Sequence, residues 1–548
     1  MTVAASVRSA FPASVRSAFA DRFAVDRRAL AAFRVALAAV VLVDLALRLP
    51  DVRAFYTDAG VLPRALLLES FPTLGQLTVH TLFGGVWWQL VLFAATAAAA
   101  LALAVGYRTR LATATTLVLL VSLQLRNPVL LNAGDSLLRR LLLWSVLLPL
   151  GARWSVDARR RDATTPSDPG DAGTAGAHDD RLLSTAGVGL LVQVLAVYVV
   201  NAALKARGSA WHDGVAGRLA FGMDALTVLL GDVVAGVPVL LTLGTYAWLV
   251  LLAASPLLVL ATGRTRTAVA AGLAAGHVAM ALSLRLGAFP LVSVASLLPF
   301  LPSFVWDRVE RVVDDHLAHR IDALAPPTRD IAGGPLTASP SNPGLPEVVR
   351  DLGAASARTV AAVLLAFVLV WNAAGLGLLA LPADVTATVD PEERRWDMFA
   401  PEPRATGGWY VTTGTTTTGE RVDAFAGTDP RSGSDASGDA DARTVPPDVD
   451  ATYPSHRWYV YLTALRDAPA PALRDRFGAY LCERWNRRHD ATLTSVNVTF
   501  VERRVVLDAP DRIAVRPFGT TDCTRATTAT NGSEHATRND GGWRAETD

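Results

Sequence analysis

Long apolar runs dominate this chain and constrain its fold more than any other feature. A helix needs about 20 apolar residues to cross the ~30 Å hydrocarbon layer of a membrane. Runs that approach or exceed this length lie at residues 29–49, 79–105, 111–125, 137–150, 182–204, 227–262, 268–284, 286–304 and 357–382. Pro238 can divide the sixth run into two helices. We therefore expect an all-α polytopic membrane bundle of about nine helices.

Composition supports this fold class. Hydrophobic residues make up 51% of the chain, charged residues make up 18%, and the mean hydropathy is +0.31. These values are typical of integral membrane proteins rather than soluble enzymes. The N-terminal arm, residues 1–28, lacks a small-residue cleavage site, so we expect no removable signal peptide. The arm repeats ASVRSAFP almost unchanged as ASVRSAFA; a recent duplication and an interfacial amphipathic anchor both explain the repeat.

The arginines predict the orientation in the membrane. Cytoplasmic loops of membrane proteins carry an excess of basic residues. A cytoplasmic N-terminus places the arginine-rich loops inside, with Arg108, Arg110, Arg153, Arg159, Arg160, Arg161, Arg264, Arg266, Arg308, Arg311 and Arg320. An odd number of spans then puts the tail outside, so we expect a multi-pass cell-membrane protein. Because the orientation in the membrane explains why these loops are rich in arginine, we expect no nucleic-acid partner.

The tail has a different character from the apolar runs. Acidic residues outnumber arginines in it, and a Gly/Ser/Asp/Pro linker at about 427–450 is too polar to bury a core. Segments Trp409–Thr413 and Thr494–Val506 partly alternate like strands, and a stretch from about Pro471 to Arg488 is helix-like. We expect a transmembrane domain at 29–382 and a small extracytoplasmic α+β domain at 383–548, interrupted by a disordered linker.

The tail also holds both cysteines of the chain, Cys482 and Cys523. An extracytoplasmic compartment permits a disulfide between them, and two unpaired thiols are the alternative. Sequons begin at Asn497 and Asn531, which makes both asparagines candidate glycosylation sites.

One lysine stands apart from every other basic residue. All but one of the 51 Lys and Arg residues are arginine, and the exception is Lys205, at the end of the fifth run. A lysine ammonium can lose its proton when desolvated, whereas a guanidinium effectively cannot. Tyr198, Asn201 and Lys205 are spaced to share one helix face, and Trp211 follows. Two interpretations stay open: the ammonium snorkels into water, or a desolvated amine acts as general base or nucleophile.

Polar residues also occur at two other places in or beside the apolar runs. His277 lies inside the seventh run, where Gly276 lets another helix come close; His277 is either a helix–helix hydrogen-bond partner or a catalytic group. Asn132 and Asp135 precede the fourth helix, and either one can cap it. Asp135 can also pair with a basic residue near the outer opening. The sequence has no Walker loop, dinucleotide fingerprint, nucleophile elbow or zinc-type spacing, and we expect no metal.

Several strings together resemble the HTTM (horizontally transferred transmembrane) domain family, membrane proteins related to vitamin K-dependent γ-glutamyl carboxylase. The matches follow the family's order and cover roughly residues 25–305 plus pieces of the tail. They are Phe55–Pro63 (FYTDAGVLP), Arg126–Pro128, Asn132–Asp135, Leu147–Gly151, Trp154–Asp157, Asn201–Lys205 with Trp211, His277 with Leu286–Pro290, and Trp396–Pro401 (WDMFAP). As a set these motifs are specific.

The resemblance implies quinol chemistry. In the carboxylase, a lysine matching Lys205 deprotonates vitamin K hydroquinone, and a histidine matching His277 stabilises the glutamate carbanion to which carbon dioxide adds. We therefore expect a reduced menaquinone or other vitamin K-type quinol as cofactor, and a substrate site that includes Asn132, Asp135, Tyr198, Asn201 and Trp211. The chain departs from the carboxylase pattern at Ala133, where the carboxylase has a histidine, and at Ala206, where it has a second lysine.

Two functions stay open at this point. One is a carboxylase-like membrane enzyme that takes its quinol from the lipid bilayer and acts on an extracytoplasmic protein. The other is a non-catalytic membrane protein that binds lipid or assists the maturation or export of an outer-surface protein. A base role predicts that Lys205→Arg is as damaging as Lys205→Ala, because arginine keeps the charge and does not release the proton.

Overall fold

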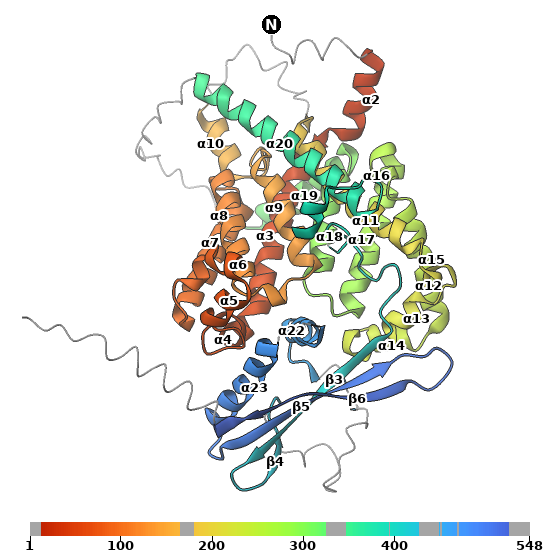
Figure 1. Ribbon diagram of the computed structural model, residues 1–548. Helices are drawn as coiled ribbons and strands as arrows, with labels where there is room; N and C mark the ends of the chain where they lie inside the picture. The colour runs from red at the N-terminus through yellow and green to blue at the C-terminus, as the bar shows by residue number, and fades with distance from the viewer. Residues whose placement is uncertain are drawn as a thin grey trace, which may run out of the picture.

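The computed structural model describes residues 12–164, 180–324, 347–388, 390–393, 395–426, 446, 449, 452–467 and 471–524. These residues form mostly helices, with a small antiparallel sheet near the C-terminus. The helices make a bundle, and the C-terminal domain lies against one end of it (Figure 1). The expected fold class, a helical bundle followed by a small α+β domain, is confirmed at this level.

In the part of the chain that the structure describes, four helical segments are long and apolar enough to cross a membrane. They are Arg27–Tyr56, Val86–Val105, Thr185–Lys205 and Ala355–Gly375. A fifth is added if Phe289–Phe300 and Ser303–Asp315, which meet at 107°, form one broken span. The remaining predicted runs form shorter or more polar helices, so the count of nine spans stays a prediction.

Except for the helix at Ser303–Leu324, the longer helices of the bundle overlap the predicted runs. Their bounds are α3 Arg27–Arg48, α7 Val86–Val105, α8 Thr109–Arg126, α9 Ala133–Val146, α11 Thr185–Lys205, α15 Pro238–Ala253, α17 Gly263–Ser283, α18 Phe289–Leu297, α19 Ser303–Leu324 and α20 Glu347–Gly375. Helix α15 begins at Pro238, as predicted, because proline fits the first helical position, where no N–H is needed. Helix α19 was not predicted, since its sequence is charged and amphipathic rather than apolar.

Short helices connect these elements. They are α2 Ala13–Phe23, α4 Val52–Tyr56, α5 Arg64–Ser70, α6 Pro72–Gln76, α10 Val156–Thr164, α12 Ser209–His212, α13 Ala216–Phe221, α14 Gly231–Ala235, α16 Leu257–Leu260 and α21 Ala383–Thr388, together with the 3₁₀ turns Leu49–Asp51, Val79–Thr81, Pro128–Leu130, Asp224–Leu226 and Leu298–Phe300. The two-residue strands β1 (Val25–Asp26) and β2 (Arg181–Leu182) pair antiparallel.

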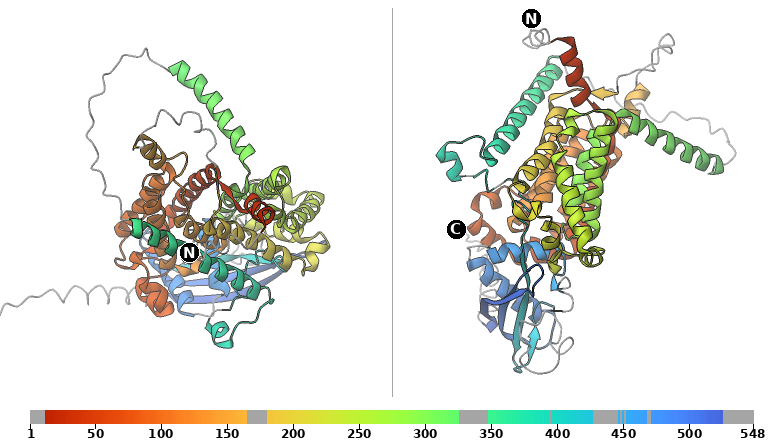
Figure 2. Two further views of the ribbon diagram at one scale, coloured as in Figure 1. Left: turned by 90° about the horizontal axis from the view of Figure 1, so that it is seen from above. Right: turned by 90° about the vertical axis from the view of Figure 1, so that its right-hand side faces the viewer.

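Helices α3 and α11 organise the bundle core. Helix α3 contacts α7, α9 and α18, and α11 contacts α9, α15 and α20. Gly189 on α11 faces the ring of Trp144 on α9, and a Cβ there would overlap the indole. Glycine at this position therefore permits the close approach of α9 and α11. Helix α20 lies on the outside of the bundle (Figure 2).

The C-terminal domain contains one four-stranded antiparallel sheet in the order β4-β3-β5-β6. The strands are β3 Thr406–Thr416, β4 Arg421–Asp423, β5 Leu493–Arg504 and β6 Arg512–Asp522, and the helices are α22 His456–Asp467 and α23 Pro471–Asn486. Trp409 pairs with Val501 at the centre of the β3–β5 ladder. The predicted strands and the predicted helix α23 are confirmed, whereas α22, β4 and β6 were not predicted.

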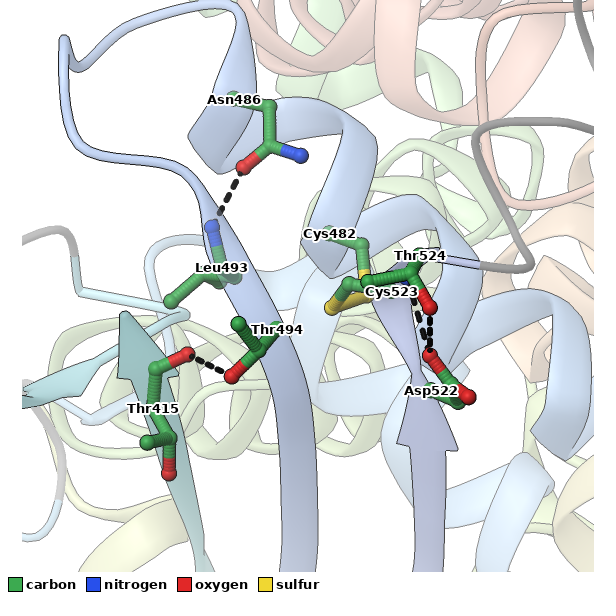
Figure 3. The surroundings of a disulfide bond; sticks show 8 residues. All are labelled: Thr415, Cys482, Asn486, Leu493, Thr494, Asp522, Cys523 and Thr524. Atoms are coloured by element: carbon green, nitrogen blue, oxygen red, sulfur yellow. Dashed lines mark hydrogen bonds between the residues drawn. A yellow bond between two sulfur atoms is a disulfide. The ribbon is translucent and has the colours of Figure 1, made fainter. Parts of the chain in front are cut away.

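A disulfide ties α23 to the end of the sheet. It joins Cys482 on α23 to Cys523, which follows β6 (Figure 3). The chain therefore holds a disulfide and not two unpaired thiols. Asn497 on β5 is exposed, and its side-chain oxygen accepts a hydrogen bond from Thr520 at 3.2 Å. Asn531 lies outside the described residues, as does nearly all of the predicted linker at 427–450.

Candidate functional site

Lys205 is buried at the C-terminal end of α11. The residue as a whole is only 2% exposed. Its Nζ donates to the backbone carbonyls of Met398, at 2.6 Å, and Phe399, at 3.1 Å. The same Nζ lies 4.1 Å from the centroid of the Trp211 ring. The interpretation that the ammonium snorkels into water is therefore wrong, because a tail segment covers it.

Residues 396–402 form the segment that covers Lys205. Side chains on α11 and α12 donate hydrogen bonds to the backbone of this segment. Asn201 Nδ2 donates to the carbonyls of Trp396, at 3.2 Å, and Met398, at 3.1 Å. Trp211 Nε1 donates to the Phe399 carbonyl at 3.1 Å. The motif that contains Asn201, Lys205 and Trp211 thus binds the backbone of the WDMFAP motif almost two hundred residues later.

The far end of the 396–402 segment is bound to α12. The Glu402 carboxylate accepts hydrogen bonds from the backbone N–H groups of Ser209, at 2.5 Å, and Ala210, at 3.1 Å. These are donors in the first turn of a helix, which have no partner within it. Gly208 precedes them, and a Cβ on Gly208 would overlap the Pro401 carbonyl. The segment therefore depends on a glycine for its close approach.

His277 forms a second buried group with Tyr198. The Tyr198 hydroxyl and His277 Nε2 are 3.2 Å apart, and this contact joins α11 to α17. His277 Nδ1 is buried and has no hydrogen-bond partner. The rings of Trp248 and Phe289 each lie in a T-shaped arrangement with the imidazole. A Cβ on Gly276 would come within 2.6 Å of Trp248, so the expectation that Gly276 permits close helix packing is confirmed.

Asn132 and Asp135 form a capping box at the start of α9. The Asn132 side chain accepts from the Asp135 N–H at 3.1 Å, and the Asp135 carboxylate accepts from the Asn132 N–H at 3.2 Å. The predicted capping role is confirmed, and it explains why α9 begins four residues earlier than the apolar run.

Asp135 also belongs to a buried charge cluster of Asp44, Arg48, Asp135 and Arg457, all of them at most 5% exposed. Arg48 pairs with Asp44 at 2.7 Å and with Asp135 at 2.5 Å. Arg457 pairs with Asp44 at 2.6 Å and with Asp135 at 2.9 Å. The cluster is neutral overall and joins α3, α9 and α22. The expected pairing of Asp135 with a basic residue is confirmed.

Sequence reasoning missed the other members of this cluster. Asp44 and Arg48 are an i, i+4 pair of charges inside the first apolar run, which is a signal that could have identified them. Arg457 lies in the tail, and nothing in its neighbourhood of the sequence marks it as a partner of the bundle.

A cavity of about 520 Å³ lies between the bundle and the C-terminal domain. Met223, Leu226 and Phe289 form apolar walls, and Asn132 and His456 contribute polar groups. Met398 and Phe399 also line the cavity, whereas Lys205 does not. The 396–402 segment therefore separates the Lys205 amine from the cavity by one layer of backbone.

His456 is a titratable group of this cavity that lies outside the membrane helices and whose pKa is strongly shifted. Both ring nitrogens are buried without a hydrogen-bond partner. Burial, with a smaller contribution from the neighbouring Arg457, lowers the pKa of His456 to about 4. The imidazole is therefore neutral at physiological pH and carries two unused polar atoms beside the cavity.

This pKa predicts a loss of stability in mild acid. Because the folded pKa lies below the ordinary value of 6.5, the unfolded chain binds the proton first, and the free energy of unfolding falls as the pH drops from about 6.5 towards 4. We expect His456 to contribute about 1–3 kcal/mol of this fall. Denaturant titrations of the wild type and His456→Gln at several pH values measure it; parallel curves for the two proteins would contradict the expectation.

The structure sorts the residues expected from the sequence into three groups. Asn201, Lys205 and Trp211 bind the 396–402 segment, Tyr198 and His277 pair between helices, and Asn132 and Asp135 cap α9. Asn132 lines the cavity directly. Comparisons with protein-family models, with curated proteins and with solved structures find no match to this chain.

Proposed function

We propose that the protein is a multi-pass membrane protein of the HTTM type, with nine membrane helices, a cytoplasmic N-terminus and an extracytoplasmic C-terminal domain. Helix α2 and the C-terminal domain lie at opposite ends of the bundle (Figure 1). Large apolar side chains face outward between these ends, among them Trp87, 78% exposed, Leu243, 62%, and Val363, 63%. Such surfaces are suited to lipid. The disulfide suits an oxidising compartment.

We propose further that the protein is a quinol-dependent, carboxylase-like enzyme with Lys205 as its base. One observation carries this proposal: the chain's sole lysine is buried against two carbonyls and an indole ring. Within the described residues it forms no direct ion pair. Amines placed in this way serve as general bases and nucleophiles.

The neighbouring cavity is large enough for a two-ring phenolic headgroup. Its volume of about 520 Å³ lies in the usual range for small-molecule sites, roughly 300–1,000 Å³. Met223, Leu226 and Phe289 suit the apolar face of such a group. The orphan ring nitrogens of His456 and the amide of Asn132 suit its oxygen atoms. Both the cavity and Lys205 touch Met398 and Phe399, so a shift of that backbone opens one to the other.

Each residue of the site then has a definite task. A reduced naphthoquinone bound in the cavity would supply the phenolic proton and, on reaction with oxygen, a base strong enough to remove a γ-proton from glutamate, to which carbon dioxide would then add. Lys205 accepts a proton at Nζ when the Met398 and Phe399 carbonyls withdraw. Asn201 and Trp211 bind the same carbonyls and keep water from the amine while the segment is closed. His277, oriented by Tyr198, is the polar group assigned to charge stabilisation.

Quinol binding and carbon dioxide fixation test this function. The wild type, Lys205→Arg, Lys205→Met and Arg207→Gln are titrated with reduced menaquinone in lipid nanodiscs and assayed for fixation into glutamyl peptides. We expect Lys205→Arg to lose activity by about 10²-fold or more, as much as Lys205→Met, because loss of a general base has this effect. Arg207→Gln, two residues away on an exposed side chain, should behave like the wild type.

Full activity of Lys205→Arg would exclude the base role.

The second candidate function is the non-catalytic one, in which the protein binds lipid or assists the maturation or export of an outer-surface protein. The observation that favours it is the complete engagement of Lys205 by backbone carbonyls, which makes the lysine an anchor for the C-terminal domain. Absence of quinol binding in all four proteins would support this second function.

A further inference from the structure

A second pocket lies at the end of the bundle opposite the C-terminal domain, beside α2 (Figure 1). Its volume is about 610 Å³, and it is formed by α2, the β1–β2 pair, the start of α17 and the turn before α19. Three arginines line it, Arg22, Arg181 and Arg266, against two acids, Asp21 and Asp26. Asp26 pairs with Arg28 at 3.0 Å and Asp21 pairs with Arg181 at 3.3 Å, so Arg22 and Arg266 are the lining arginines that pair with no acid among the described residues.

Arg266 is the unusual member of this pocket. It is only 5% exposed and, among the described residues, it pairs with no acid. Its Nη1 donates to the Arg22 carbonyl at 2.9 Å, and its guanidinium lies over the Phe300 ring, but its Nε is buried without a hydrogen-bond partner. Arg34, the other deeply buried arginine without an acid, donates to three carbonyls. A buried charge with so few acceptors is costly unless an anion accompanies it.

The same pocket contains the uncapped start of α17. Thr262 and Gly263 line it, and the Thr262 side chain makes no capping hydrogen bond. The first-turn N–H groups of this 21-residue helix lack partners within the helix, and the helix dipole favours an anion there. One pocket therefore contains both a buried guanidinium whose Nε has no hydrogen-bond partner and the first-turn donors of a helix.

Exposed apolar side chains lie on the same elements as this charged pocket, or next to them in the sequence. Val15 and Phe19 on α2 are 49% and 45% exposed, and Leu260 at the end of α16 is 62% exposed. Val15 and Phe19 are four residues apart and so lie on one face of α2. An anionic head beside exposed apolar side chains, at one end of a membrane bundle, matches the chemistry of a phospholipid.

We infer that this pocket binds the phosphate headgroup of an anionic phospholipid. Arg266 and the α17 N-terminus hold the phosphate, Arg22 adds positive charge beside it, and the acyl chains lie against Val15, Phe19 and Leu260. The site is independent of Lys205 and of the cavity at the other end of the bundle.

Native mass spectrometry with added lipid tests this site. Phosphatidylglycerol, phosphatidylcholine and inorganic phosphate are titrated separately onto the purified full-length wild type, Arg266→Gln and Arg264→Gln. We expect the wild type to prefer phosphatidylglycerol to phosphatidylcholine by roughly tenfold, and Arg266→Gln to lose that preference. Arg264→Gln is the matched control, because Arg264 is exposed, two residues away, and does not line the pocket; it should keep the wild-type preference.

Three results would overturn the inference. An unchanged preference of Arg266→Gln for phosphatidylglycerol would show that the pocket does not bind this lipid. If inorganic phosphate binds as tightly as phosphatidylglycerol, the pocket recognises phosphate alone and not a lipid. If Arg266→Gln does not fold, Thr262→Asp replaces it, because an aspartate there caps α17 and fills the anion position from within the chain. Thr262→Asp should fold and lose the preference, and a preference that persists in this variant also overturns the inference.

Discussion

Replacement of Arg457 by methionine is expected to destabilise the folded protein by about 3–5 kcal/mol, the usual cost of removing one partner from a buried ionic group. Arg457 pairs with both acids of the buried charge cluster, Asp44 at 2.6 Å and Asp135 at 2.9 Å. Without it, two buried carboxylates share the single charge of Arg48. Because Arg457 belongs to the C-terminal domain, we expect this domain to detach from the bundle before the bundle unfolds.

Denaturant unfolding, followed by limited proteolysis of the tail, measures both effects. Arg404→Met is the control, since the Arg404 side chain is 67% exposed and its pair with Asp467, at 3.5 Å, is on the surface. Surface pairs contribute only about 0–1 kcal/mol. The double variant Asp44→Asn with Arg457→Met restores the balance of charge and should recover part of the loss. A loss no larger than that of Arg404→Met would show that the buried cluster does not hold the two domains together.

Replacement of Gly208 by alanine is expected to open the covering of Lys205. The new Cβ would overlap the Pro401 carbonyl, which is backbone and cannot rotate away. The 396–402 segment must then shift, and the Met398 and Phe399 carbonyls leave Nζ. Because an overlap of this kind costs about 1–3 kcal/mol, we expect acylation of the Lys205 amine to accelerate by roughly tenfold or more.

The composition of the chain makes this measurement clean. Lys205 is the sole lysine, so an amine-specific acylating reagent has only that side chain and the N-terminal amine to modify. Peptide mapping by mass spectrometry separates these two products. Gly244→Ala on α15 is the control, because a Cβ at Gly244 meets nothing within 4 Å. Equal acylation of the wild type and Gly208→Ala would show that the segment does not protect the amine.

Local sequence was sufficient to predict much of the fold. Helix α15 starts at Pro238 and α9 is capped by Asn132, because capping and proline rules act within one turn of chain. The strand β5 and the helix α23 follow from periodicity, which also needs only neighbouring residues. The spacing of Asn201 and Lys205 likewise predicts their common face on α11.

The sequence could not identify which distant residues bind the side chains on this helix face. Lys205 and Asn201 bind backbone carbonyls, and every residue has a carbonyl, so no residue type marks Met398 or Phe399 as acceptors. Arg457 is one of many arginines in the tail, and its role depends on the docking of α22 beside α3 and α9.

The sequence by itself determined that the chain forms apolar helices followed by a small mixed domain, and that its sole lysine ends the fifth apolar run. Only the tertiary structure decided that the tail covers this lysine, that Tyr198 meets His277, and that Asp44, Arg48, Asp135 and Arg457 form one neutral cluster. The physical reason is the range of the forces involved. Periodicity and capping act over a few residues, whereas a hydrogen bond or ion pair between distant segments exists only after the chain has packed.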